Sequence, residues 1–394
     1  MKVVAFFVRH FTERGTEVST YNYAHFNEKI LRNKSLIIAY NGPKQKKIEP
    51  FINTTRKIFE KRFEVIEIQN IEEMRQIILL KKISFCYIQS HGTFRDYYQL
   101  SNKKIWQNCV TTYHYVFGPM IRQGSVNRAV LGEDLNKRFN KKIPVLPYIV
   151  EEFKELGNLR DTLNIPKNAF VYGRHGGFKT FDIELVHICI REILSKRDDI
   201  YFIFLNTEKF YKHKNIIYLD RNSNLEFKLK FISSCDAMIH SRKDGETFGL
   251  SVAEFSSANK PIITYSRSLD KEHIRILNKK GILFESKNEL LKIFNTLNKE
   301  YISDKDWNAY KTYNPEIIME LFQKICLNKT KKSIKKILIE FLYDLPWEIY
   351  NFFKITKNWI FIMLMKLIPS KFKKIFQKIL QNNIIKKFFY KSLR

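Results

Sequence analysis

The sequence has no cysteine pair of the kind that holds zinc or forms a disulfide framework. Its five cysteines are scattered along 394 residues, and no two of them make a Cys-x-x-Cys pair. This spacing argues against a structural zinc site and against a disulfide-stapled secreted scaffold. We therefore expect a reducing compartment. The cysteines are Cys86, Cys109, Cys189, Cys235 and Cys326.

Long apolar runs are also missing. No stretch reaches the roughly 18 consecutive apolar residues that a membrane-spanning helix needs. The apolar run at the start, VVAFFV, is short and no small-residue cleavage site follows it. We expect a first buried strand there rather than a signal peptide.

Acidic residues are scarce, above all at the end of the chain. Asp and Glu number 40 against 69 Lys and Arg, a net charge of +29, and from Leu327 onward 16 Lys or Arg accompany only 3 acids. Lys alternates there with Ile, Leu, Phe and Trp at helical spacings, a pattern typical of segments that lie on anionic membrane surfaces. Helices packed on the globular part, or a protein-binding surface, are the alternatives. We expect no nucleic-acid partner, because no recognised motif and no glycine-rich aromatic platform is present.

The rest of the chain has the composition of packed domains, with 44% hydrophobic and 14% aromatic residues. Strand-like apolar runs alternate with helical stretches, which is typical of parallel sheets with helices on both faces. The predicted strands span 2–8, 35–40, 63–68, 83–89, 108–113 and 127–131, and then 169–174, 200–206, 215–219, 236–240 and 261–265.

Two prolines interrupt this alternation near 143–153 and mark a linker. The sequence therefore predicts a first Rossmann-like domain at 1–147, a second at 148–327 and a basic amphipathic helical tail at 328–394. Ligands of such doubly wound domains bind outside the carboxyl ends of the strands. A cleft between the two domains is the natural site.

Two glutamates mark the segment HSRKDGETFGLSVAEFSSANKPIITY, which begins at His240. Seven residues separate Glu246 from Glu254, a distance of about 12 Å in a helix. The first amides of that helix lack intrahelical partners and favour anions. Glu246 beside them is suited to accept hydrogen bonds from hydroxyl groups. Two surface glutamates on an ordinary helix are the alternative.

This segment resembles the E-x7-E motif of retaining glycosyltransferases with the two-domain GT-B fold, family 4 in particular. The resemblance implies that Glu246 and the amides of Thr247, Phe248 and Gly249 contact a donor sugar. It also implies that Glu254 contacts the ribose of the nucleotide.

One glycine-containing loop follows the first strand of each predicted domain. In YGRHGGFKTFD, Gly176 and Gly177 make a tight turn, and the resemblance implies that Arg174 and Lys179 hold the donor diphosphate. A basic surface loop is the alternative. Gly15 stands where the family keeps a glycine-rich loop near donor phosphates and acceptor, although many members have two adjacent glycines and this chain has one.

Two histidines follow apolar strands. His114 matches a family position where a histidine borders the reactive cleft, so we name it with Glu246 as a catalytic candidate. His91 is a possible site residue, with a structural role as the alternative.

The resemblance implies transfer of a sugar, with retention of configuration, from a nucleotide diphosphate sugar to a glycan or glycolipid acceptor. We expect no cofactor, because the family needs no metal and no Asp-x-Asp pair is placed to bind one. With the tail on an anionic membrane, the protein is expected in the cytoplasm, peripheral on the inner face of the cell membrane, in polysaccharide or lipopolysaccharide synthesis. The alternatives are a sugar-nucleotide epimerase of the same fold and a non-catalytic membrane or nucleic-acid adaptor.

Overall fold

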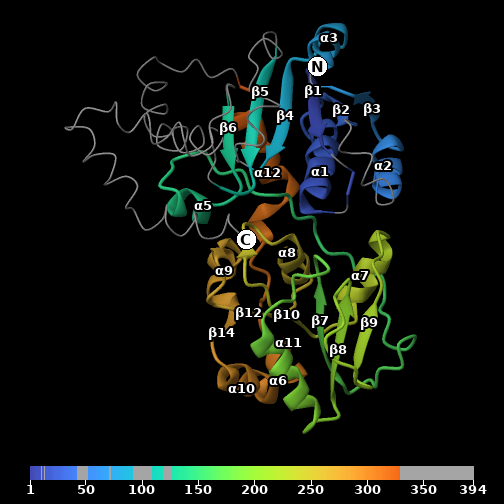
Figure 1. The fold of residues 1–394 in the computed structure, drawn as a ribbon, viewed down its shortest axis with the longest axis vertical. Helices are drawn as coiled ribbons and strands as arrows, with labels where there is room; N and C mark the ends of the chain where they lie inside the picture. The colour runs from blue at the N-terminus through green and yellow to red at the C-terminus, as the bar shows by residue number, and fades with distance from the viewer. Residues whose placement is uncertain are drawn as a thin grey trace, which may run out of the picture.

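A computed structural model describes residues 1–9, 11–12, 14–41, 52–70, 72–91, 109–118 and 127–328. Apart from residue 328, the predicted tail lies outside the described residues, and its association with membranes stays a prediction. The described part forms two α/β domains that lie one above the other along the longest axis (Figure 1). None of the helices in this part is long and apolar enough to cross a membrane.

The first domain is built on a sheet of six parallel strands in the order β3-β2-β1-β4-β5-β6. Its strands are β1 (Val3–Val8), β2 (Lys34–Tyr40), β3 (Glu64–Ile68), β4 (Phe85–Ser90), β5 (Val110–Tyr115) and β6 (Asn127–Val130). Its helices are α1 (Gly15–Lys29), α2 (Ile52–Glu60), α3 (Glu73–Leu80) and α5 (Glu133–Arg138).

The second domain repeats this strand order, as β14-β12-β10-β7-β8-β9. Its strands are β7 (Phe170–His175), β8 (Ile200–Leu205), β9 (Ile216–Leu219), β10 (Ala237–His240), β12 (Ile262–Tyr265) and β14 (Gly281–Phe284), and the short strands β11 (Gly245–Glu246) and β13 (Asp270–Lys271) pair separately. Its helices are α6 (Glu184–Leu194), α7 (Leu225–Ser233), α8 (Leu250–Ser257), α9 (Glu272–Leu277), α10 (Lys287–Thr296) and α11 (Lys299–Ser303).

Each sheet reverses its strand order beside its first strand, which is the place where doubly wound domains bind ligands. In Figure 1 the arrowheads of β4, β5 and β6 point toward the second domain, and that of β7 points back toward the first. The carboxyl ends of the two sheets therefore face each other. The predicted fold class of two Rossmann-like domains is confirmed.

The last described helix, α12 (Pro315–Cys326), returns to the first domain. Phe322 on it stacks on Phe6 at 6.0 Å and on Tyr23 at 5.2 Å between ring centroids. The Thr112 hydroxyl donates to the Cys326 carbonyl at 3.3 Å. The sequence placed this helix in the second domain, whereas its apolar face is part of the core of the first.

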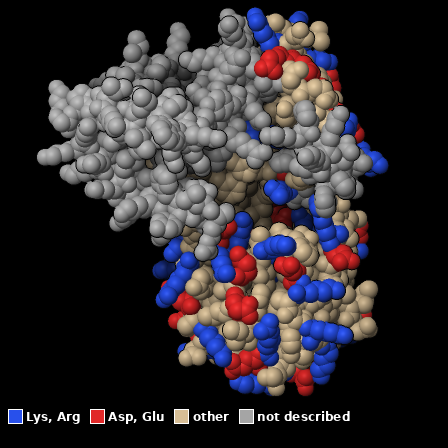
Figure 2. Space-filling model, in the orientation of Figure 1, with Lys and Arg blue, Asp and Glu red and all other residues tan. Residues whose placement is uncertain are grey.

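Polar contacts join the two domains on either side of the linker. Tyr148 donates to Gln89 Oε1 at 3.0 Å, and Gln89 in turn donates to Ser19 on α1 at 2.6 Å. On α5, the Asp134 amide donates to Glu272 Oε2 at 2.8 Å. The surface is hollowed between the domains, with acidic and basic side chains around the hollow (Figure 2).

Candidate functional site

The site is centred on a tightly fixed turn between β10 and β11. The Arg242 carbonyl accepts hydrogen bonds from the Gly245 amide at 3.1 Å and from the Ser268 hydroxyl at 2.8 Å. Gly245 has φ +67°, and a Cβ there would lie 1.9 Å from the Asp270 carbonyl oxygen. Only glycine fits this position, because both the backbone conformation and the space exclude a side chain.

Helix α8 begins immediately after this turn with an open N-terminus. Gly249 is its N-cap, with φ +85° and no side-chain capping hydrogen bond. This left-handed residue ends the turn, and the helix starts at the next residue, Leu250. The first-turn amides lack intrahelical partners and, with the helix dipole, favour an anion. The Thr247 side chain beside them is 7% exposed.

The Phe248 side chain does not face a ligand. It is 1% exposed and packs at 5.5 Å from Tyr148 and 5.4 Å from Tyr310, between ring centroids. Tyr310 also donates to the Phe248 carbonyl at 2.8 Å. The side chain anchors the start of α8 to the interdomain core, and the predicted contact of the Phe248 amide with the donor stays a prediction.

Glu246 is ionised and keeps one carboxylate oxygen open. Its Oε1 lies 2.8 Å from Arg242 Nη1 and 3.5 Å from His240 Nε2. Burial by itself raises the pKa of Glu246, but His240 and Arg242 outweigh that effect and hold the pKa at about 2. Its Oε2 has no hydrogen-bond partner in the described part of the chain, and the side chain is 20% exposed.

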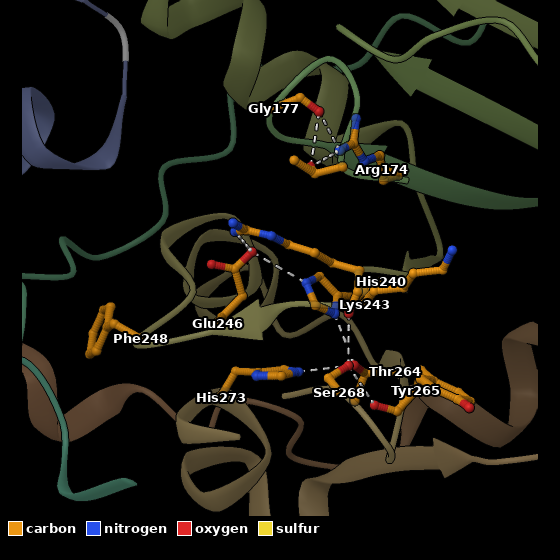
Figure 3. A network of polar contacts seen from close by, with 12 residues as sticks. Arg174, Gly177, His240, Lys243, Glu246, Phe248, Thr264, Tyr265, Ser268 and His273 are labelled. Atoms are coloured by element: carbon orange, nitrogen blue, oxygen red, sulfur yellow. Dashed lines mark hydrogen bonds and ion pairs between the residues drawn. The ribbon is translucent and has the colours of Figure 1, made fainter. Parts of the chain in front are cut away.

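A buried chain of hydrogen bonds holds Nδ1 of His240, the ring nitrogen that does not face Glu246. Its Nδ1 lies 2.9 Å from the Thr264 hydroxyl, which lies 3.1 Å from Nε2 of His273 (Figure 3). Thr264 and His273 are fully buried, and burial lowers the pKa of His273 to about 3. This chain fixes the orientation of the His240 ring toward Glu246.

Glu254, on α8, is the second ionised carboxylate. Lys228 donates to its Oε1 at 2.5 Å, and His175 Nε2 lies 3.0 Å from its Oε2. Burial raises its pKa, but Lys228 and His175 outweigh that and hold the pKa at about 2. Each carboxylate oxygen has two acceptor sites, so a hydroxyl can still share them. The side chain is 25% exposed.

Arg174 is not available to a ligand in this structure. Its side chain is buried at 3% exposure, and Nη1 donates to the Asn206 carbonyl and the Thr207 hydroxyl. Nη2 donates to the Gly177 carbonyl at 2.8 Å and the Thr180 hydroxyl at 2.6 Å. The predicted contact of Arg174 with phosphate does not fit, because four of its five N–H groups already bind the chain itself.

The glycine loop presents a different cation. Asn206 holds the Gly176 carbonyl at 2.8 Å, and the Gly177 carbonyl accepts from Arg174, so both glycines have structural contacts. Lys179 follows them, exposed and with no partner among the described residues. Its predicted role at the diphosphate stays a prediction.

His114 lies in the core of the first domain. It is fully buried, its Nδ1 is 2.6 Å from the Tyr87 hydroxyl, and burial lowers its pKa to about 3. Its ring lies between the rings of Tyr23 and Tyr148. The prediction that His114 borders the reactive cleft is wrong, because buried aromatic side chains surround it.

A small cavity of about 30 Å³ lies at the carboxyl ends of β1 and β4. Glu17 lines it, and burial raises the pKa of Glu17 to about 7 although Thr12 and Thr16 donate to its Oε2. His91 lines it as well and stacks on Phe117 at 5.5 Å. Sequence reasoning missed Glu17, whose one signal was its position two residues after Gly15.

The two halves of the predicted site meet at Gly15. A Cβ there would lie 3.2 Å from Leu250 Cδ1, so the start of α1 touches the start of α8. Among the described residues, no three histidine, cysteine, aspartate or glutamate side chains lie close enough together to hold a metal ion. The site thus joins an open helix N-terminus, two ionised glutamates and several cations at one domain boundary.

No protein-family model and no curated protein matches the sequence. A glycosyltransferase from Rickettsia africae has a similar structure, with 15% identity and a TM-score of 0.62, over 84% of this chain and 99% of that chain. HepE of Anabaena in complex with UDP-glucose is 13% identical over 82% and 98%, with a TM-score of 0.60. A Listeria monocytogenes protein assigned as a UDP-N-acetylglucosamine 2-epimerase is 11% identical over 81% and 94%, with a TM-score of 0.53.

The chain has the GT-B fold. At these identities the similarity extends to the architecture alone. Within the GT-B fold, the turn that carries Glu246 and the helix that carries Glu254 lie at the carboxyl end of the second sheet, next to the first domain.

Proposed function

We propose that the protein is a retaining glycosyltransferase that moves a sugar from a nucleoside diphosphate sugar to a hydroxyl group of a glycan or lipid-linked acceptor. The observation that carries the proposal is Glu246, an ionised carboxylate with one open oxygen beside the open N-terminus of α8. The GT-B fold shared with HepE, which was solved with UDP-glucose, supports it.

In this proposal the two glutamates bind opposite ends of the donor. Oε2 of Glu246 accepts a hydrogen bond from a sugar hydroxyl, and Glu254 accepts from the ribose while keeping Lys228 and His175. The first-turn amides of α8 meet the diphosphate between them. Lys179 adds a positive charge at the outer end of the site.

The reaction breaks the bond between the anomeric carbon and the diphosphate oxygen, and its electron pair leaves with the diphosphate. The acceptor oxygen bonds to the same face of that carbon, and the departing phosphate takes the acceptor proton. Amides and cations that are already in place stabilise the charge growing on the phosphate. Glu246 orients the sugar and forms no covalent bond.

The acceptor and the place of action belong to the same proposal. The basic tail at 328–394 brings the enzyme to the anionic inner face of the cell membrane, where lipid-linked polysaccharide or lipopolysaccharide precursors are available. We propose that transfer needs no metal and no nucleic-acid partner.

Donor hydrolysis tests the proposal without knowledge of the acceptor. Purified protein is incubated with UDP-, GDP- and ADP-sugars, and released sugar is measured, since transferases leak slowly to water. Glu246→Gln is expected to lower this rate about 10- to 100-fold, the effect of one charged hydrogen bond. Glu300→Gln, an exposed glutamate on α11, is the matched control and keeps the rate. Equal rates in both variants contradict the role of Glu246.

An epimerase is the second candidate, because an assigned epimerase shares the fold. The same incubation separates the two reactions. An epimerase converts the donor to an isomeric nucleotide sugar with no acceptor present, and a transferase yields free sugar and nucleoside diphosphate.

A further inference from the structure

The donor diphosphate needs a cationic partner. Arg174, the arginine that the motif indicates, already donates its hydrogen bonds within the chain. Arg174 is 3% exposed, and four of its N–H groups donate hydrogen bonds to Asn206, Thr207, Gly177 and Thr180. Burial lowers its pKa to about 10, so it stays charged without help from a ligand. Freeing it would leave buried carbonyl and hydroxyl acceptors without a donor, which is costly.

Arg242 is in the opposite situation. Its side chain is 27% exposed, and in the described part of the chain its one hydrogen bond is from Nη1 to Glu246 Oε1 at 2.8 Å. Four of its five N–H groups are therefore open. Burial lowers its pKa, but the carboxylates of Glu246 and, less strongly, of Asp244 and Asp270 outweigh that, so the net pKa is raised and the guanidinium stays charged.

The backbone of Arg242 is rigid although its side chain is open. Its carbonyl accepts from Gly245 and Ser268, and the next residue donates its amide to Asp182 Oδ1 at 2.8 Å. The guanidinium thus lies against the carboxylate of Glu246, four residues before the first residue of α8, Leu250. A phosphate at the first-turn amides of α8 would be bound by the same turn of chain that carries Arg242.

We propose that Arg242, and not Arg174, is the guanidinium that binds the diphosphate of the donor, and that Glu246 holds it in place until the donor arrives. Arg174 is then a positioning residue that shapes the loop carrying Lys179. The inference rests on the proposed function, because it names a residue that binds the diphosphate in the same donor site.

The test compares binding with and without the diphosphate. Dissociation constants are measured for UDP and uridine, for GDP and guanosine, and for inorganic pyrophosphate, by calorimetric titration of the full chain. In the wild type the diphosphate is expected to bind more tightly than its nucleoside. Arg242→Gln is expected to reduce that advantage about 10- to 100-fold and to leave the nucleoside affinity unchanged.

Three further variants separate binding from positioning. Glu246→Gln removes the partner of Arg242, so binding of UDP and pyrophosphate is expected to stay or to tighten. Arg174→Lys is expected to lower the melting temperature and leave the ratio of diphosphate to nucleoside affinity unchanged. Arg197→Gln removes a positive charge at the amino end of β8, where Arg197 pairs with Asp199, and serves as the control for overall charge.

The outcomes distinguish this inference from the function beneath it. If the wild type binds no nucleoside diphosphate, the proposed function fails and the inference fails with it. If the wild type prefers the diphosphate and Arg242→Gln keeps the full preference, the inference alone is overturned. It is also overturned if Arg242→Gln and Glu246→Gln both weaken binding of a UDP-sugar while UDP itself binds as before.

Discussion

At the scale of single residues, burial and nearby charge decide which groups of this protein are ionised. Glu246 and Glu254 both lose hydration, but each has cationic or imidazole partners within 3.5 Å, and both keep a pKa of about 2. Glu17 is only 4% exposed, and the hydroxyl groups of Thr12 and Thr16 donate to its Oε2. Its pKa rises to about 7.

Glu17 therefore predicts a pH dependence of stability. Its pKa is raised from 4.5 to about 7 in the folded protein, so the folded state binds its proton more tightly than the unfolded state does. That contribution is fully present below pH 4.5 and is lost as the pH rises through 7. Relative to Glu17→Gln, the wild type is expected to lose on the order of 2–3 kcal/mol of unfolding free energy across this window.

Denaturant unfolding of both proteins at pH 4.5, 6 and 8 measures the loss. The comparison with Glu17→Gln cancels other groups that titrate in the window, Asp270 among them, whose burial raises its pKa to about 6. A constant difference between the two proteins at all three pH values contradicts the raised pKa.

The sequence could predict Glu246 and Glu254 because their spacing is a local property of one segment. It could not predict that Arg174 is buried, because its acceptors Asn206 and Thr207 come from a loop some thirty residues away. It misplaced His114 for the same reason. A strand end predicts the edge of a sheet and does not show which side chains of other elements close over it.

At the scale of elements, the turn before α8 depends on one glycine. Gly245→Ala is expected to destabilise the fold by on the order of 3 kcal/mol, because the left-handed backbone strains and a Cβ meets the Asp270 carbonyl. Gly157→Ala is the matched control, since Gly157 has φ +84° but nothing within 4 Å of an added Cβ. Its cost is about 1–2 kcal/mol, the cost of the backbone alone.

Unfolding free energies of the two alanine variants check this prediction. Equal losses in both would show that the Asp270 carbonyl moves aside and that the turn is not as rigid as the structure has it.

Elements with strong period-two or helical patterns could be predicted from the sequence, and the described central strands of both sheets lie where they were expected. The edge strand β14 was missed, because it is partly exposed and only Phe284 on it is buried. The short pair β11 and β13 was missed as well, because a strand of two residues is too short to show the alternation of buried and exposed side chains. They pair in parallel, and only the folded domain supplies the crossover that brings them together.

At the scale of the whole molecule, the chain crosses back to its first domain through α12. The sequence placed residues 315–326 in the second domain, because order along the chain does not show which sheet a helix covers. Because the helix follows the second domain and packs on the first, it ties the two domains together in addition to the linker.

Phe322→Ala is expected to cost about 3–5 kcal/mol of unfolding free energy, since the ring is fully buried against Phe6 and Tyr23. Ile317→Ala on the same helix is the control, because Ile317 is 43% exposed and its loss is expected to cost less than about 1 kcal/mol. Similar losses from both substitutions would contradict the packing of α12 on the first sheet.

The central claim is that the domain boundary holds a nucleoside diphosphate, and a thermal-shift screen of the purified protein against UDP, GDP, ADP and CMP tests it most directly. A ligand that binds only the folded state adds about 2.7 kcal/mol of stability at 100 times its dissociation constant. We predict a rise in melting temperature with one diphosphate, which is lost in Glu254→Ala. No shift with any of the four nucleotides would contradict the account.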